Sequence, residues 1–145
     1  MVEQHTIHSR SGIATAVGVL SAIYAATFFF GALMHLGVRI PLGFGDLSEP
    51  TILPAAIVES LCGLALLLFG AFAVLTRTSW AWTGAFAANT FALGGVLLGV
   101  IALALGAGPS TDLNTIYHRV MLVALVAVLA LLLSPAGRTA LNRGG

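Results

Sequence analysis

Four long apolar segments constrain this chain of 145 residues more than any other feature. They run over about residues 12–36, 53–75, 80–105 and 113–134. A helix needs roughly 20 apolar residues to cross the hydrocarbon core of a bilayer, and the first three segments are long enough. The sequence therefore predicts an all-α fold, a single integral membrane domain built as a four-transmembrane-helix bundle. Neighbouring helices are antiparallel, and we expect no strands.

The composition excludes several classes of function. Only 8% of the residues are charged and 59% are hydrophobic, whereas soluble domains carry about 25% charged residues. The six basic residues are scattered arginines, so the chain has no basic patch for nucleic acid. Cys62 is the single cysteine, which excludes an intrachain disulfide and a zinc site built on several thiolates. The partner that this composition indicates is the lipid bilayer.

The distribution of arginines predicts the orientation of the bundle. In a four-span arrangement, four arginines fall on one side and two on the other: Arg10, Arg77, Arg138 and Arg143 against Arg39 and Arg119. Loops rich in arginine stay in the cytoplasm. We therefore predict a multi-pass protein of the cell (plasma) membrane with both termini cytoplasmic. Trp80 and Trp82 would then lie at the inner interface, and the connection 37–52 would face outward.

The fourth span is informative because its apolar core is short. Residues 120–133 make 14 residues, or about 21 Å at 1.5 Å per residue, which is less than the ~30 Å of hydrocarbon. The helix must therefore begin earlier, with Ser110 or Thr111 as its N-cap. Its end is marked by Ser134 and the Pro135 that follows. Polar residues of its first turns would lie at, or just inside, the outer face of the membrane.

Glu59 is the most informative single residue. It lies about two turns into the second span, on the same helix face as Cys62 and Gly63. A carboxylate at this depth is costly, so such a residue faces the bundle interior and has a partner. The small groups on this face are typical of a helix–helix contact or a narrow cavity.

Candidate partners come from the outer ends of the other helices. His35 closes the first span, and Asn114 and His118, four residues apart, share one face of the fourth helix. Arg119, on the neighbouring face, is a second candidate for a contact with Glu59. Asn89 in the third span lies deeper, near the middle of the membrane. We take Glu59, His35, His118, Asn114, Arg119 and Asn89 as candidate ligand-binding residues; no catalytic residue is assigned.

Several interpretations of this cluster remain open. An Arg119–Glu59 or His–Glu pair is a structural lock that holds helix register. Alternatively, the cluster meets the polar head of a lipophilic molecule such as a quinone, with apolar walls around its tail. Two histidines are also compatible with axial haem ligation in a membrane oxidoreductase, or with a metal held together with the glutamate. Finally, Glu59 is compatible with a proton carrier in transport.

Small residues along the third span favour close helix packing. Gly95 and Gly99 form a GxxxG pattern, which allows helix backbones to approach within a membrane. The pattern is compatible with packing inside one bundle and with the seam of a homodimer or of a larger membrane complex.

Segment 55–70 resembles the second span of the DoxX-like family of small four-helix membrane proteins. The resemblance lies in the acidic Glu59, followed by a glycine and a leucine-rich run to a second glycine, with Arg77 in the next short loop. The first span departs from the family, which tends to place Gly and Lys where this chain has Gly31 and His35. The resemblance implies a link to membrane redox assemblies and quinone-dependent oxidation, often as an accessory subunit beside a catalytic partner. Glu59 is the single residue to which the resemblance assigns a role, that of a pocket or interface residue.

Overall fold

Long helices make up nearly all of the protein. A computed structural model describes the backbone of residues 2–109 and 111–142, and the side chains of these ranges from Gly12 onward. The predictions above also name Arg10, Ser110 and Arg143, whose side chains lie outside the described part of the chain. The helical segments are α1 Val2–His35, α2 Leu53–Ala65, η1 Leu66–Phe72, α3 Ala73–Leu75, α4 Ala81–Ala104, α5 Asp112–Leu133 and α6 Pro135–Leu141.

The predicted fold class is confirmed. Within the described ranges, four helical stretches are long and apolar enough to cross a membrane: Gly12–His35, Leu53–Leu75, Ala81–Ala104 and Asp112–Leu133. The second stretch is continuous through α2, η1 and α3. The chain is therefore a multi-pass membrane protein built as a helical bundle.

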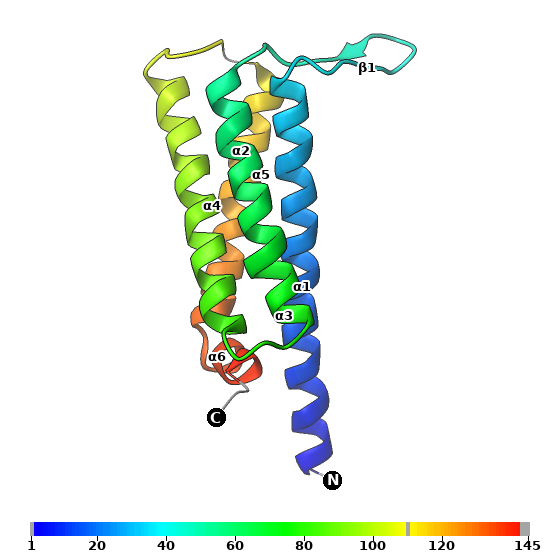
Figure 1. Cartoon of the computed structure of the whole chain (residues 1–145), viewed down its shortest axis with the longest axis vertical. Helices are drawn as coiled ribbons and strands as arrows, with labels where there is room; N and C mark the ends of the chain where they lie inside the picture. The colour runs from blue at the N-terminus through cyan, green and yellow to red at the C-terminus, as the bar shows by residue number, and fades with distance from the viewer. Residues whose placement is uncertain (1, 110, 143–145) are drawn as a thin grey trace.

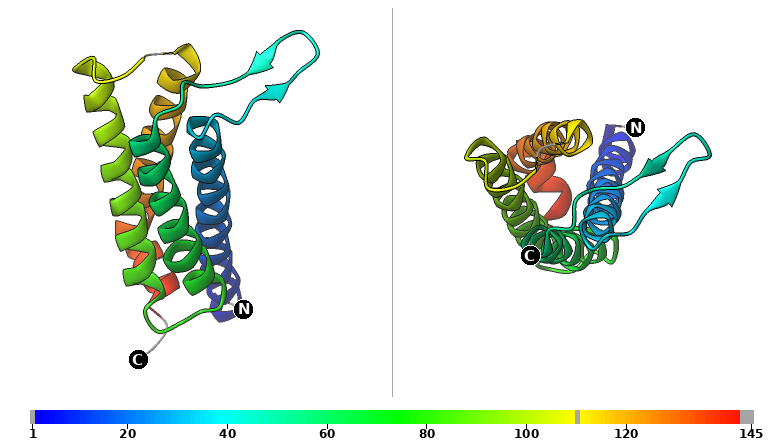
Figure 2. Two further views of the ribbon diagram at one scale, coloured as in Figure 1. Left: turned by 45° about the horizontal axis from the view of Figure 1, so that its top comes forward. Right: turned by 90° about the horizontal axis from the view of Figure 1, so that it is seen from above.

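The four long helices follow one another around the bundle in chain order. The view from above shows α2 between α1 and α4, and α5 beside α4 (Figure 2). The short helix α6 turns back beneath the bundle and packs against both α1 and α5 (Figure 1). We call the end with the α1–α2 connection the hairpin end, and the end with α3 and α6 the opposite end.

The long connection between α1 and α2 contains a small hairpin, which corrects the expectation of no strands. Strand β1 (Ile40–Pro41) pairs with β2 (Asp46–Leu47) in antiparallel register. Gly43 at its tip has a φ of 81°, a backbone conformation that glycine adopts without strain. Strands of two residues carry no alternating pattern long enough to detect in a sequence.

The boundaries of α5 agree with the chemistry of its ends. Thr111 is the N-cap, and its hydroxyl accepts a hydrogen bond from the backbone N–H of Asn114 at 3.0 Å. The helix ends before Ser134, as predicted. Ser134 also caps α6 by accepting from the Gly137 N–H at 3.0 Å, with Pro135 at the first helical position. The Ser-Pro pair predicted only a stop, although it is equally a start signal.

The second span contains a π-helical segment, η1, that the sequence did not predict. Its wider turn brings Gly70 against α1, where a side-chain Cβ at position 70 would lie 2.9 Å from Ser21 Oγ. Short π-helical stretches within α-helices occur frequently at functional sites. Here the segment also separates the hairpin-end half of the span, which carries Glu59, from its last turn.

Glycines allow the helices to approach closely inside the bundle. Gly63 of α2 lies against α1, where an added Cβ would be 3.1 Å from the Phe29 ring and 3.2 Å from the Ala25 carbonyl oxygen. Gly95 of α4 lies against Cys62, with 2.6 Å between such a Cβ and Sγ. Gly99 faces His118. Both glycines of the GxxxG pattern are thus used within one bundle, which argues against their use as a dimer seam.

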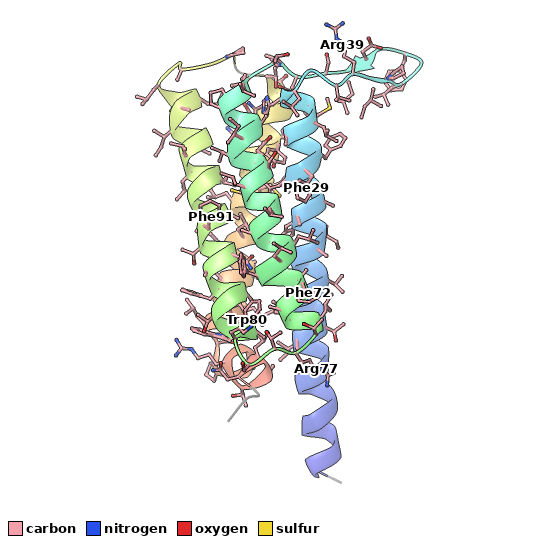
Figure 3. The ribbon with its side chains drawn as sticks, viewed as in Figure 1. Phe29, Arg39, Phe72, Arg77, Trp80 and Phe91 are labelled. Carbon is pink, nitrogen blue, oxygen red and sulfur yellow. The ribbon has the colours of Figure 1, made fainter. Side chains whose placement is uncertain are left out.

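The two ends of the bundle differ in their side chains. Arg39 extends from the hairpin, whereas Arg77 and Trp80 lie at the opposite end (Figure 3). There the Trp82 indole N–H donates to the Leu132 carbonyl at 2.9 Å, and the Arg138 guanidinium lies 5.6 Å from the centre of the Trp82 ring. Indole rings and arginines are the groups expected at a membrane–water interface.

We predict that Gly63→Leu destabilises the bundle by about 1–3 kcal/mol, because the added side chain overpacks the α1–α2 contact. Thermal unfolding of detergent-solubilised protein, followed by tryptophan fluorescence, measures the change. Gly94→Leu is the matched control, because a Cβ there meets nothing within 4 Å and points away from the bundle. Equal melting temperatures for the two variants would contradict the packing described here.

Candidate functional site

A cavity of about 280 Å³ lies at the hairpin end of the bundle. All four long helices contribute to its wall, together with the ends of two connections. Its polar lining comes from α1, α2 and α5, and its apolar lining from α2, α4 and the connection after α4. The polar lining residues are His35, Glu59, Asn114 and His118. The structure thus brings together four of the six residues that the sequence singled out.

Glu59 lies on the inner side of α2, with 7% of its surface exposed. One carboxyl oxygen, Oε1, is 4.0 Å from Nε2 of His35. Gly31 of α1 leaves the space for this carboxyl group, since a Cβ at position 31 would lie 2.8 Å from Oε1. The buried acid is therefore turned toward an imidazole of another helix, as expected for an ionisable residue within a membrane.

His35 is held in place by the connection that follows the hairpin. Its Nδ1 lies 3.2 Å from the carbonyl oxygen of Pro50, and the Ile52 N–H donates to the His35 carbonyl at 3.0 Å. A carbonyl oxygen only accepts, so Nδ1 carries the proton of this contact. The other ring nitrogen, Nε2, is thereby directed toward Glu59.

His118 is oriented in the same way from within α5. Its Nδ1 lies 2.8 Å from the carbonyl oxygen of Asn114, one turn earlier, so Nδ1 again carries the proton. Its Nε2 packs against Gly99 of α4, and a Cβ at position 99 would collide with it. The glycine is therefore required for the position of this ring at the cavity wall.

A second group of side chains lies beneath the cavity. The Tyr117 hydroxyl lies beside the Glu59 carboxyl group, and the Tyr117 ring meets the Phe28 ring edge-on at 6.3 Å. Within the described part of the chain, neither Tyr117 OH nor Glu59 Oε2 forms a hydrogen bond. Cys62 is fully buried below them against Gly95 and fills space.

The predicted Arg119–Glu59 lock is not formed. Arg119 is exposed, and the carboxyl group of Glu59 faces His35 instead. The reason is the helical repeat: one residue beyond His118 lies about 100° further around α5. Because His118 faces the cavity, Arg119 points out of the bundle.

Asn89 is buried but does not line the cavity. Its amide nitrogen donates to the Ala85 carbonyl at 2.8 Å, within its own helix. Its Oδ1 has no hydrogen-bond partner among the described residues, and the same holds for the hydroxyl of the buried Ser21. Each of these two residues lies further from the hairpin end, along its helix, than the cavity-lining residues of that helix do.

The exposed part of the cavity wall is apolar. The polar lining residues are buried, whereas Pro54 of α2 and Leu98 of α4 remain exposed. Ala107, in the connection after α4, is also exposed, so the exposed lining lies at the hairpin ends of α2 and α4 and in that connection. The quinone interpretation included apolar walls, but the sequence did not identify their residues, because alanines and leucines on a membrane helix look the same whether they line a cavity or contact lipid.

The connections hold the hairpin end closed around the polar groups. The Thr111 hydroxyl lies 2.8 Å from both carboxyl oxygens of Glu49, which joins the start of α5 to the α1–α2 connection. Together with the His35–Pro50 contact, this bond fixes two helix ends that line the cavity.

The described residues contain no group of three His, Cys, Asp or Glu side chains placed to hold a metal ion together. His35, Glu59 and His118 line one cavity without forming such a group. The polar lining residues His35, Glu59, Asn114 and His118 carry groups that can form hydrogen bonds with a ligand.

Comparison of the chain with models of protein families, with curated proteins and with solved structures finds no match in any of the three.

Proposed function

We propose that this protein binds the polar head of a lipophilic molecule, such as a quinone or another lipid, in the cavity at its hairpin end. The observation that carries the proposal is the arrangement of the lining: its hydrogen-bonding groups are buried, and its exposed residues are apolar. Ligand sites are mostly apolar with a few placed polar groups that fix orientation.

The size of the cavity favours a single ring or a comparable head group. Sites for drug-sized ligands usually measure ~300–1,000 Å³, and the 280 Å³ here is at the small end of that range. A long tail would extend through the mouth into the bilayer. The four-pyrrole macrocycle of haem is a poor fit to this space, so the quinone or lipid interpretation is the better supported one.

In keeping with the DoxX-like resemblance of its second span, we propose that the protein is an accessory subunit of a membrane redox system. Its buried acid and imidazoles would hold the head group, while the reaction would take place on a partner. We further propose the plasma membrane as its location, with both termini cytoplasmic, on the basis of the arginine distribution.

We predict that Ala102→Phe lowers the binding of decylubiquinone at least about tenfold, which corresponds to about 1.4 kcal/mol. Ala102 lines the cavity, and a phenyl group there fills the apolar part without altering a polar residue. Binding is measured on protein in lipid nanodiscs, by extraction and chromatographic quantification of the retained quinone.

Ile101→Phe is the matched control for this variant. Ile101 is 54% exposed and lies outside the cavity lining, so the same phenyl group points toward lipid. Equal quinone retention by the two variants, or no retention by the unaltered protein, would contradict the proposed function.

The orientation predicts that a cysteine introduced at Phe44 reacts with a membrane-impermeant maleimide added to intact cells. Phe44 lies in the hairpin and is 90% exposed, whereas the native Cys62 is fully buried and supplies a low background. Ala136→Cys at the opposite end should react only after the cells are broken. The reverse pattern would place the hairpin and the cavity on the cytoplasmic side.

A further inference from the structure

We infer that the cavity selects head groups that donate hydrogen bonds, so that it holds a quinol in preference to the corresponding quinone. This inference rests on the proposed function and adds the oxidation state of the ligand to it. It follows from the tautomer of His118, which the structure determines through a backbone contact.

A backbone contact determines which ring nitrogen of His118 carries the proton. Nδ1 donates to the Asn114 carbonyl, so in the neutral imidazole the lone pair lies on Nε2. Nε2 therefore presents a hydrogen-bond acceptor at the cavity wall, beside Gly99.

The other polar groups of the cavity lining are His35, Glu59 and Asn114. His35 and Glu59 face each other, so a proton on either group is directed at the lone pair of the other. A proton in the Nε2–Oε1 contact therefore lies between these two groups and not beside His118. The Asn114 side chain contains both a donor and an acceptor and so favours neither form of a ligand.

The quinol and quinone forms of the head group differ in whether they can donate a hydrogen bond. A quinol hydroxyl donates to Nε2, whereas a quinone oxygen can only accept. A quinone in the same position would set two acceptors against each other in a buried site, which leaves both without a hydrogen bond. Sites built to pair with a hydroxyl discriminate strongly against an analogue that lacks it.

The experiment compares decylubiquinol with decylubiquinone, under anaerobic conditions, on protein in lipid nanodiscs. We expect the quinol to bind at least about tenfold more tightly, or about 1.4 kcal/mol. Equal or tighter binding of the quinone would overturn the inference while leaving the proposed function intact. If neither form binds, the proposed function fails, and this inference fails with it.

Two further measurements assign the preference to His118. His118→Phe keeps a ring of similar shape and removes the acceptor, so we expect the preference for quinol to fall to near equality. Val120→Phe is the control, because Val120 is 59% exposed and lies outside the cavity lining. Nitrogen-15 NMR of ring-labelled histidine reads the tautomer without any variant: an unprotonated Nε2 on His118 supports the inference, and a protonated Nε2 overturns it.

Discussion

The organisation of the hairpin end depends on one buried contact, the carboxyl group of Glu59 facing the imidazole of His35. An ionisable group within a membrane is costly unless another group compensates it. Each neighbouring feature serves this contact. Gly31 leaves room for the carboxyl group, and the Pro50 carbonyl holds the imidazole in the tautomer that directs Nε2 toward the acid.

The cavity is a consequence of the same arrangement. Glycines and alanines of α2 and α4 line the cavity beside the polar residues, and their small size leaves space between the helices. Gly95 and Gly99 of α4 both pack against side chains inside the bundle, those of Cys62 and His118 respectively. What remains is a small volume whose polar groups are fixed by backbone contacts and whose entrance is apolar. Such a site is prepared for a head group attached to an apolar tail.

Much of this arrangement could be predicted from the sequence, because antiparallel spans bring alternate helix ends to one level. His35 at the end of one span, Glu59 near the start of the next and His118 near the start of the last must therefore lie near the same face. The rotation of each helix could not be predicted in this way. Apolar residues surround α5 on all sides below its first turns, so hydropathy alone did not separate inward His118 from outward Arg119. The helix that begins at Pro135 was missed because the Ser134-Pro135 pair is compatible with both a helix end and a helix start. The apolar sequence around Gly70 contains no signal that separates a π-helical turn from an α-helical one.

A double-mutant cycle between His35 and Glu59 tests the central contact most directly. His35→Phe and Glu59→Gln keep the approximate shapes of the two side chains, and the stability of both single variants and of the double variant is measured by unfolding in detergent. If the two groups contact each other as described, their effects are non-additive by about 0.5 kcal/mol or more. Additivity within about 0.3 kcal/mol would mean that the two side chains do not interact, and the basis of the polar site would be lost.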